Sequence, residues 1–283
     1  MKVTVLGSGS PEAYAPRASA GHLVEIGDTR ILLDCGGGVF DRLLQAGFKP
    51  SEIDVICFTH LHSDHMMDYA RLIHAAWDEG GAPVHVYGPA PIGAITDKLF
   101  GADGVFAHDL AARTEHSASQ DVWQARGGTL PRPWPAPIVT EITPGFAHSS
   151  GAWRLASCEV PHAQPHLTCM AFALSAGGKK LVYSGDAGMC NALEKLAVGA
   201  DLLLHWCYRM SDQQDVPAFF KMACPTPPEI AAMAQRTGAR RLVLTHMREM
   251  NDTAEKQARA LAEMKAAFDG PSSIAEDLDV FVL

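Results

Sequence analysis

Two observations in the sequence predict a large α/β fold. Short apolar runs rich in β-branched residues recur along the chain and alternate with segments of helical apolar spacing. The chain also has 283 residues, of which 47% are hydrophobic and 19% charged, so it can bury a large core. Length alone allows one large domain or two small ones. Because no repeat, low-complexity tract or linker divides the sequence, we expect a single domain over residues 1–283.

Short strands dominate the first part of the chain. A turn of hairpin type at Gly27-Asp28-Thr29 joins the second and third strands, and a helix ended by Gly47 follows them. The glycine cluster at 36–38 fits neither a GxGxxG nor a Walker pattern, so we interpret it as tight turns that let the backbone pass close to a site. The expected strands lie at 3–6, 23–26 and 30–33, and the expected helix at 39–46.

The stretch 59–65 carries four metal-binding side chains directly after the apolar run 55–58, which predicts a buried strand. If the chain stays extended for one more step, the first two histidines point to the same side. The other two residues fall where a helix over 66–77 begins. Imidazole and carboxylate are the usual ligands of zinc and its neighbours, so we predict a metal site here. These residues are His60, His62, Asp64 and His65.

The middle of the chain contains a segment of different character at 101–137. It follows an expected strand at 84–87 and an expected helix at 92–100, and it has weak periodicity and a proline-rich end. We interpret it as an insertion over the domain surface, either a lid, an oligomer contact or a plain surface loop with some helix.

The last half of the chain alternates strands with two well-marked helices. Thr226-Pro227-Pro228-Glu229 is a capping box with proline at the first helical position, and Gly238 ends that helix. A final helix begins near Asp252 and runs to about Phe268. The expected strands lie at 138–142, 154–160, 169–175, 180–184, 201–204, 241–245 and 280–283.

Several of these apolar strands are followed at once by a side chain that can bind metal. Any one of them could be an ordinary histidine or aspartate, but the repeated relation favours a shared site. Open sheets place their sites outside strand ends, where loops can hold polar groups without burying them unpaired. The residues in this position are His60, His162, Asp186, His205 and His246.

Composition limits the compartment and the partners. The net charge of −9 gives no general attraction to phosphate backbones, and no basic run appears. Seven cysteines without CxxC spacing favour reduced thiols, and no signal or membrane-spanning segment is evident, so we expect a cytoplasmic protein without a membrane partner.

The motifs resemble those of the metallo-β-lactamase superfamily. The resemblance rests on the HxHxDH block at 60–65, on His162, on Ser184-Gly185-Asp186 and on Leu244-Thr245-His246. Leu6-Gly7-Ser8-Gly9-Ser10-Pro11 and Leu33-Asp34-Cys35-Gly36 are similar to the ribonuclease Z and arylsulfatase-like branch. The family's fold is a four-layered αββα sandwich with two metals at one edge of its sheets. The resemblance thus implies that fold and a metal-dependent hydrolase.

Carried over by position, the resemblance implies a complete ligand set for two divalent ions. Zinc is the expected metal because histidine, not glutamate, stands second in the block; manganese and iron suit the same nitrogen and oxygen donors. The first metal would be held by His60, His62 and His162, the second by Asp64, His65 and His246, and Asp186 would bridge them.

Two metals would lower the pKa of a bridging water enough to supply hydroxide near neutral pH. We expect Asp64 both to bind metal and to orient that hydroxide. His205 is the expected proton donor to the leaving group, and His166 is a weaker candidate. Trp206 follows His205 where the ribonuclease branch has glutamate, which puts that branch's proton relay in doubt.

We expect the substrate to be a small ester: a sulfate, phosphodiester, lactone or carboxylic ester. The short interval between His162 and Asp186 leaves no room for the long basic arm of the tRNA-processing branch, and the acidic net charge agrees, so we expect no nucleic-acid partner. Two alternatives stay open, a ribonuclease Z-like phosphodiesterase acting on RNA and a non-catalytic metal-bound scaffold. Relatives are commonly homodimers, which is the expected assembly.

Overall fold

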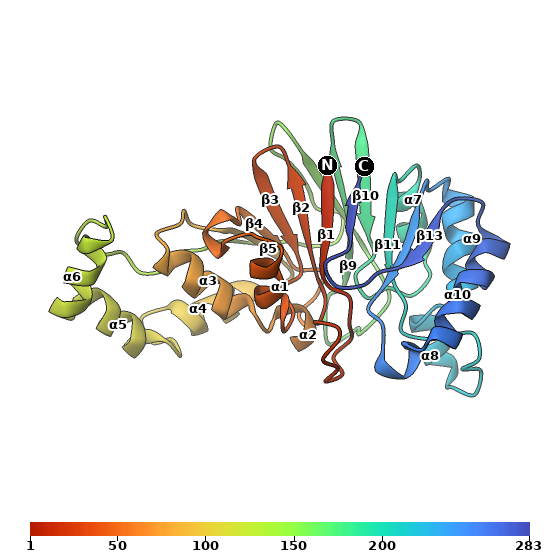
Figure 1. The fold of residues 1–283 in the computed structure, drawn as a ribbon, viewed down its shortest axis with the longest axis horizontal. Coiled ribbons are helices and arrows are strands. Elements are labelled where there is room, and N and C mark those ends of the chain that lie inside the picture. Colours follow the sequence, from red (N-terminus) through yellow and green to blue (C-terminus); the bar gives the residue numbers. More distant parts are fainter.

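The first half of the chain and its last strand build one mixed sheet. The computed structural model describes residues 1–283. The strands of this first sheet are β1 (Lys2–Gly7), β2 (Gly21–Ile26), β3 (Thr29–Leu33), β4 (Val55–Cys57), β5 (His85–Gly88), β6 (Ile138–Glu141) and β14 (Val280–Val282). They lie in the order β14-β1-β2-β3-β4-β5-β6, with parallel pairing from β3 to β6. The two ends of the chain therefore pair in one sheet, through β1 and β14 (Figure 1).

The second half builds the other sheet. Its strands are β7 (Ala147–Ser149), β8 (Arg154–Glu159), β9 (Met170–Ala176), β10 (Lys179–Tyr183), β11 (Leu202–Trp206), β12 (Leu242–Thr245) and β13 (Ser272–Ile274). They lie in the order β13-β12-β11-β10-β9-β8-β7, and the strands from β10 to β13 run parallel. Parallel strands end at the same edge, so residues that follow β10, β11 and β12 are brought together there.

Helices cover the outer face of each sheet, which makes four layers (Figure 1). One apolar cluster fills the space between the sheets, and two others lie between a sheet and its helices. The predicted αββα sandwich is confirmed. On the first sheet lie α1 (Val39–Gln45), α3 (Tyr69–Asp78) and α4 (Ile92–Phe100); on the second lie α7 (Asn191–Ala197), α9 (Pro227–Thr237) and α10 (Ala254–Ala267). Two short helices, α2 (Ser63–Met66) and α8 (Ala218–Ala223), lie at the bottom of the view instead.

The segment 101–137 contains two helices, α5 (Ala107–Glu115) and α6 (Ser117–Ala125). They project from the first-sheet end of the molecule, at the far left of Figure 1, on the side away from the second sheet. Arg132 ties the returning chain to the body, since its guanidinium lies 3.7 Å from the ring centre of Trp77 and 4.3 Å from that of Trp123. The placement of the segment 101–137 is compatible with an insertion over the domain surface. A role as a lid stays a prediction.

The helix expected over 66–77 is instead two helices, α2 and α3. They are separated at Met67 and Asp68. The carboxylate of Asp68 accepts hydrogen bonds from the backbone of Gly38 and Phe40, at 2.8 and 2.9 Å, and so serves the glycine turn rather than its own helix. A side chain that bonds backbone elsewhere favours such a break.

A buried ion pair joins the N-terminal loop to the second sheet's side of the molecule. Arg17 bonds both carboxylate oxygens of Asp252, at 2.6 and 2.8 Å, and its side chain is only 4% exposed. The same guanidinium donates to Ser8 and to the backbone of Ala275. Removing one partner of a buried pair leaves the other charge without compensation, which is strongly destabilising.

We therefore expect Arg17→Met to lower the free energy of unfolding by about 3 kcal/mol. The matched control is Arg71→Met, which breaks an ion pair with Asp41 whose side chains are 51% and 54% exposed; this change should cost under about 0.5 kcal/mol. Denaturant titration measures both. Equal losses in the two variants would contradict the structural role of Arg17.

Candidate metal centre

The metal-binding side chains predicted from the sequence come from the ends of strands in both sheets. His60 and His62 follow β4, and Asp64 and His65 lie in the single turn of α2. From the second sheet, His162 follows β8, Asp186 follows β10 and His246 follows β12. Both sheets end at a common edge, so residues up to 186 positions apart in sequence can meet there.

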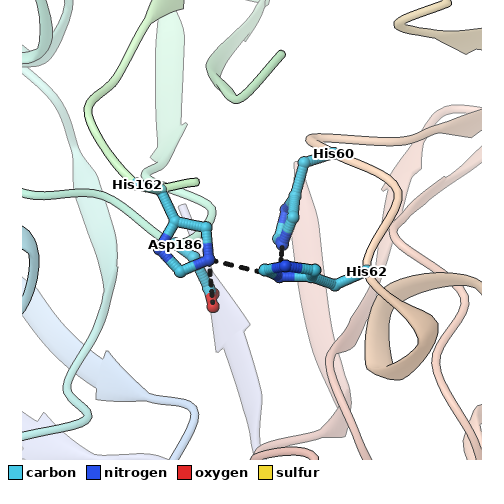
Figure 2. A group of neighbouring side chains, drawn as sticks. All are labelled: His60, His62, His162 and Asp186. Carbon is cyan, nitrogen blue, oxygen red and sulfur yellow. Dashed lines mark hydrogen bonds and ion pairs between the residues drawn. The ribbon is translucent and has the colours of Figure 1, made fainter. Parts of the chain in front are cut away.

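The structure brings all seven of these residues into two adjoining groups. In the first group, His62 Nδ1 lies 2.9 Å from His60 Nε2 and 3.2 Å from His162 Nε2, and an oxygen of Asp186 lies 3.6 Å from His162 Nε2 (Figure 2). The second group is Asp64, His65 and His246. Within each group the candidate ligand atoms lie within 4.8 Å of one another.

Asp186 lies between the two groups. One of its oxygens is 3.3 Å from His65 Nε2, and the other is 3.4 Å from His246 Nε2 and 3.6 Å from His162 Nε2. A carboxylate that faces both sets of imidazoles is placed to bridge two cations. The bridging position implied for Asp186 by the family resemblance is therefore geometrically available.

The donor set fits divalent cations. His65 Nε2 and Asp186 Oδ1 point at one another from buried positions, and neither has a hydrogen-bond partner. Buried polar atoms without partners are rare in proteins, and a cation would satisfy both. Imidazole nitrogen and carboxylate oxygen are the ligands that zinc uses, and iron and manganese accept them too.

The electrostatics of the site favour neutral imidazoles on one side and an ionised carboxylate on the other. Burial lowers the pKa of His162 to about 4, and it holds the pKa of His60 well below its usual value. Burial raises the pKa of Asp186, but the neighbouring His246 and His65 outweigh it and hold that pKa well below its usual range. Metals bind imidazole and carboxylate in these deprotonated forms.

His65 behaves differently because it faces two carboxylates. Burial lowers its pKa, but Asp186 and Asp34 outweigh burial and hold the pKa of His65 well above its usual value. A cation at Nε2 would take the place of that proton and satisfy Asp186 in the same way.

Asp34 is a buried carboxylate that sequence reasoning did not assign to the site. It follows β3 and accepts hydrogen bonds from the backbone and hydroxyl of Thr59, both at 2.8 Å, and from the hydroxyl of Tyr183 at 3.0 Å. It also lies 2.8 Å from His65 Nδ1. A carboxylate on the far nitrogen fixes the tautomer and orientation of a ligating histidine. The same signal, a polar residue directly after an apolar strand, could have found it.

Backbone geometry at the site is unusual at two residues. Asp34 and His246 have φ values of 58° and 64°, in the left-handed region that side chains other than glycine seldom occupy. A hydrogen bond at the next residue stabilises this conformation of His246, because the Met247 N–H donates to the Ser8 carbonyl at 2.7 Å. Strained residues of this kind cluster at functional sites.

Gly36 allows the glycine turn to pass directly beneath the histidine loop. A Cβ at this position would meet the carbonyl oxygen of Asp64 at 2.0 Å, which no side chain tolerates. The neighbouring Cys35 N–H donates to the His65 carbonyl at 2.7 Å. The close backbone approach expected for this glycine cluster is therefore present.

The two groups of candidate ligands open into a cavity of about 280 Å³. Five of the seven candidate ligands line it, and Trp206, Tyr208, Phe219 and Phe220 form its apolar side. Asp64 is among the lining ligands. Burial raises the pKa of Asp64, but its hydrogen bond to His246 and the charges of His65 and His246 outweigh burial and lower it. Asp64 is therefore ionised where a substrate would enter.

The structure places His205 and His166 outside this cavity. His205 is fully buried, with Nδ1 2.7 Å from the Trp206 carbonyl and no partner at Nε2. Trp206, the next residue on β11, points into the cavity in its place. His166 is exposed on the loop after His162. The role of His205 as a proton donor stays a prediction, and this placement does not support it directly.

We expect Asp34→Asn to weaken zinc binding about 10- to 100-fold, because an amide no longer fixes His65 as a carboxylate does. Competition with a chromophoric chelator measures this affinity. The control is Tyr183→Phe, which removes one neutral hydrogen bond to Asp34 and leaves its charge; its effect should be smaller. Unchanged affinity in Asp34→Asn would show that Asp34 only holds the loops in place.

Comparison with known proteins identifies the family. Residues 29–247 match the Beta-lactamase superfamily domain. Ribonuclease Z of Mycobacterium bovis (strain BCG / Pasteur 1173P2) is 30% identical over 98% of this chain and 96% of its own length. Ribonuclease Z of Mycobacterium tuberculosis (strain H37Rv) is also 30% identical, with the same coverage of both chains.

Solved structures agree with the fold. The metallo-beta-lactamase fold protein YhfI from Bacillus subtilis has a TM-score of 0.75 at 22% identity, covering 99% of this chain and 98% of its own. The short form of human tRNase Z has a TM-score of 0.71 at 20% identity, covering 100% of this chain and 99% of its own. At these identities the likeness concerns the fold.

The family implies divalent metal ions, as the ligand set does. The expectation of a small-molecule substrate without a nucleic-acid partner is wrong. It rested on net charge and on a missing arm, and the relatives that match this chain over almost its whole length are named ribonuclease Z. No helix of the chain has the length and apolar character needed to span a membrane. The chain belongs to the metallo-β-lactamase superfamily, in the ribonuclease Z branch of its metal-dependent hydrolases.

Proposed function

We propose that this protein is a phosphodiesterase that hydrolyses RNA with the help of two divalent ions. Zinc is the expected metal. The observation that carries the proposal is the convergence of seven imidazole and carboxylate side chains, five of which line one cavity, in a chain whose relatives are named ribonuclease Z. His60, His62 and His162 would hold one ion, Asp64, His65 and His246 the other, and Asp186 would serve both.

Two cations held there would lower the pKa of a bound water toward neutrality and neutralise charge on the phosphate. The chain's own contribution is position. Asp64 lines the cavity as an ionised carboxylate, 3.2 Å from His246 Nε2, so it can accept a hydrogen bond from the attacking water and orient it. Asp34 holds His65 in the orientation that turns Nε2 toward the centre.

The apolar wall of the cavity limits the water around the reacting phosphate. Trp206 donates its indole N–H to the Ala187 carbonyl, so its ring is held in place by a protein bond and needs no water. Its ring centre lies 5.1 Å from that of His162 and 5.5 Å from that of His246. A low-dielectric wall beside the ligands strengthens the electrostatic interactions that stabilise charge in the transition state.

We expect Asp64→Ala to reduce kcat/KM for RNA cleavage by about 10²- to 10⁴-fold, because the water loses its orienting partner and the second ion loses a ligand. Gel analysis of a labelled RNA with a 3′ extension measures the cleavage, with zinc added and with chelator as a second control. Asp28→Ala, at an exposed hairpin turn, should leave the rate unchanged. Full activity in a folded Asp64→Ala variant would overturn the mechanism.

RNA binding should depend only weakly on salt. Lys221, beside the cavity on α8, is the cation near the mouth that makes no ion pair, whereas Arg17 and Arg248 are paired with Asp252 and Glu12. One phosphate contact predicts a slope of about −0.7 in log affinity against log salt for a single strand. Filter binding over a salt series measures it. A slope several times steeper would reveal a basic surface elsewhere on the chain.

A further inference from the structure

The cavity beside the metal centre has an aromatic wall made of Trp206, Tyr208, Phe219 and Phe220. Trp206 and Tyr208 stack with ring centres 5.8 Å apart, and Phe220 meets Tyr208 at 6.1 Å. Three members of the wall therefore support one another. The fourth, Phe219, enters no aromatic pair and belongs to no core cluster.

Phe219 is 71% exposed, and no other phenylalanine, tyrosine or tryptophan of the chain is as exposed. Leaving a large aromatic ring in water is unfavourable, and such a ring beside a site marks a binding surface. Packing does not explain the position of this ring, because the apolar cluster between the second sheet and its helices does not include Phe219.

The ring stands between two hollows. On one side is the cavity of the metal centre, and on the other is a hollow of about 680 Å³. Phe219, Ala223 and His162 line both. The second hollow adds apolar surface from Met222, which is 74% exposed, and the unpaired ammonium of Lys221. A planar, apolar group would lie against Phe219, with an anion near Lys221.

We propose that Phe219 is a stacking platform for the nucleobase of a nucleotide adjoining the scissile phosphate, with Lys221 placed for the next phosphate along the strand. This inference rests on the proposed action on RNA. A nucleobase is the occupant that combines a planar apolar face with a phosphate on either side. Stacking on an aromatic ring tolerates every base, because each has a π face. The site thus selects single-stranded nucleotides without reading their sequence.

The test uses the metal-loaded protein and an RNA dinucleotide that carries 2-aminopurine, whose fluorescence falls when the base stacks. Two such dinucleotides are used, one with 2-aminopurine on the 5′ side of the phosphate and one with it on the 3′ side, so the probe reports the stacked base in either register of binding. Stopped-flow fluorescence records the stacking phase, and chromatography of the same mixture records cleavage. The variants are Phe219→Ala, Phe219→Trp and Val122→Ala, the last removing another exposed apolar side chain from a helix far from the site.

We expect Phe219→Ala to lose the quenching and to weaken binding about 5- to 150-fold. Phe219→Trp should keep the quenching, and Val122→Ala should match the wild type. A dinucleotide with one base removed should bind the wild type more weakly but lose nothing further in Phe219→Ala, because the ring and the base act as a pair.

Quenching that survives in Phe219→Ala while the dinucleotide is still cleaved would overturn the stacking platform and leave the proposed function intact. Quenching that depends on Phe219, in a wild type that cleaves neither the dinucleotide nor the longer labelled RNA, would support the platform and refute the phosphodiesterase. Failure of the wild type to bind the dinucleotide, in a preparation that cleaves the longer labelled RNA, would overturn the platform alone.

Discussion

The buried carboxylate of Asp34 is the point on which the site depends. It lies at the end of β3 in the first sheet and accepts a hydrogen bond from Tyr183 at the end of β10 in the second. The same carboxylate holds Thr59 and His65 in the loop that supplies four candidate ligands. One charged group thus links the two sheets and aims a ligand. Four hydrogen bonds from Thr59, His65 and Tyr183 stabilise this carboxylate, because burying it without partners would be far too costly.

Neither sheet contains a usable site alone. The first supplies His60, His62, Asp64 and His65, and the second supplies His162, Asp186 and His246. The edge where both sheets end is the place where polar side chains can meet without being buried among apolar ones. Metal ions held there would join the sheets directly, and so would add to stability through binding to the folded state alone.

The fold class and the clustering of the seven candidate ligands could be predicted from the sequence because both follow from local patterns. Apolar strands and the polar residues that directly follow them are short-range signals, and the HxHxDH block is compact enough to recognise. The break between α2 and α3 was missed because it depends on Asp68 bonding a turn some 30 residues earlier. The burial of His205 was also missed. Side chains alternate between the two faces of β11, and the sequence does not show whether His205 or Trp206 is the one that faces the cavity. Net charge misled the choice of substrate, because it sums over a surface of which the cavity is a small part.

The pairing of β1 with β14 has a consequence for how the protein is made. Lys2 lies opposite Val282, so the first sheet is complete only after the chain has been synthesised some 280 residues beyond β1. His246 and the Arg17–Asp252 pair also arrive late in synthesis. During translation the loop at 60–65 is therefore exposed with its partners missing, and contacts of such long sequence separation form slowly. The full set of candidate ligands therefore exists only once the chain has been synthesised through His246, so stable metal loading must follow that step.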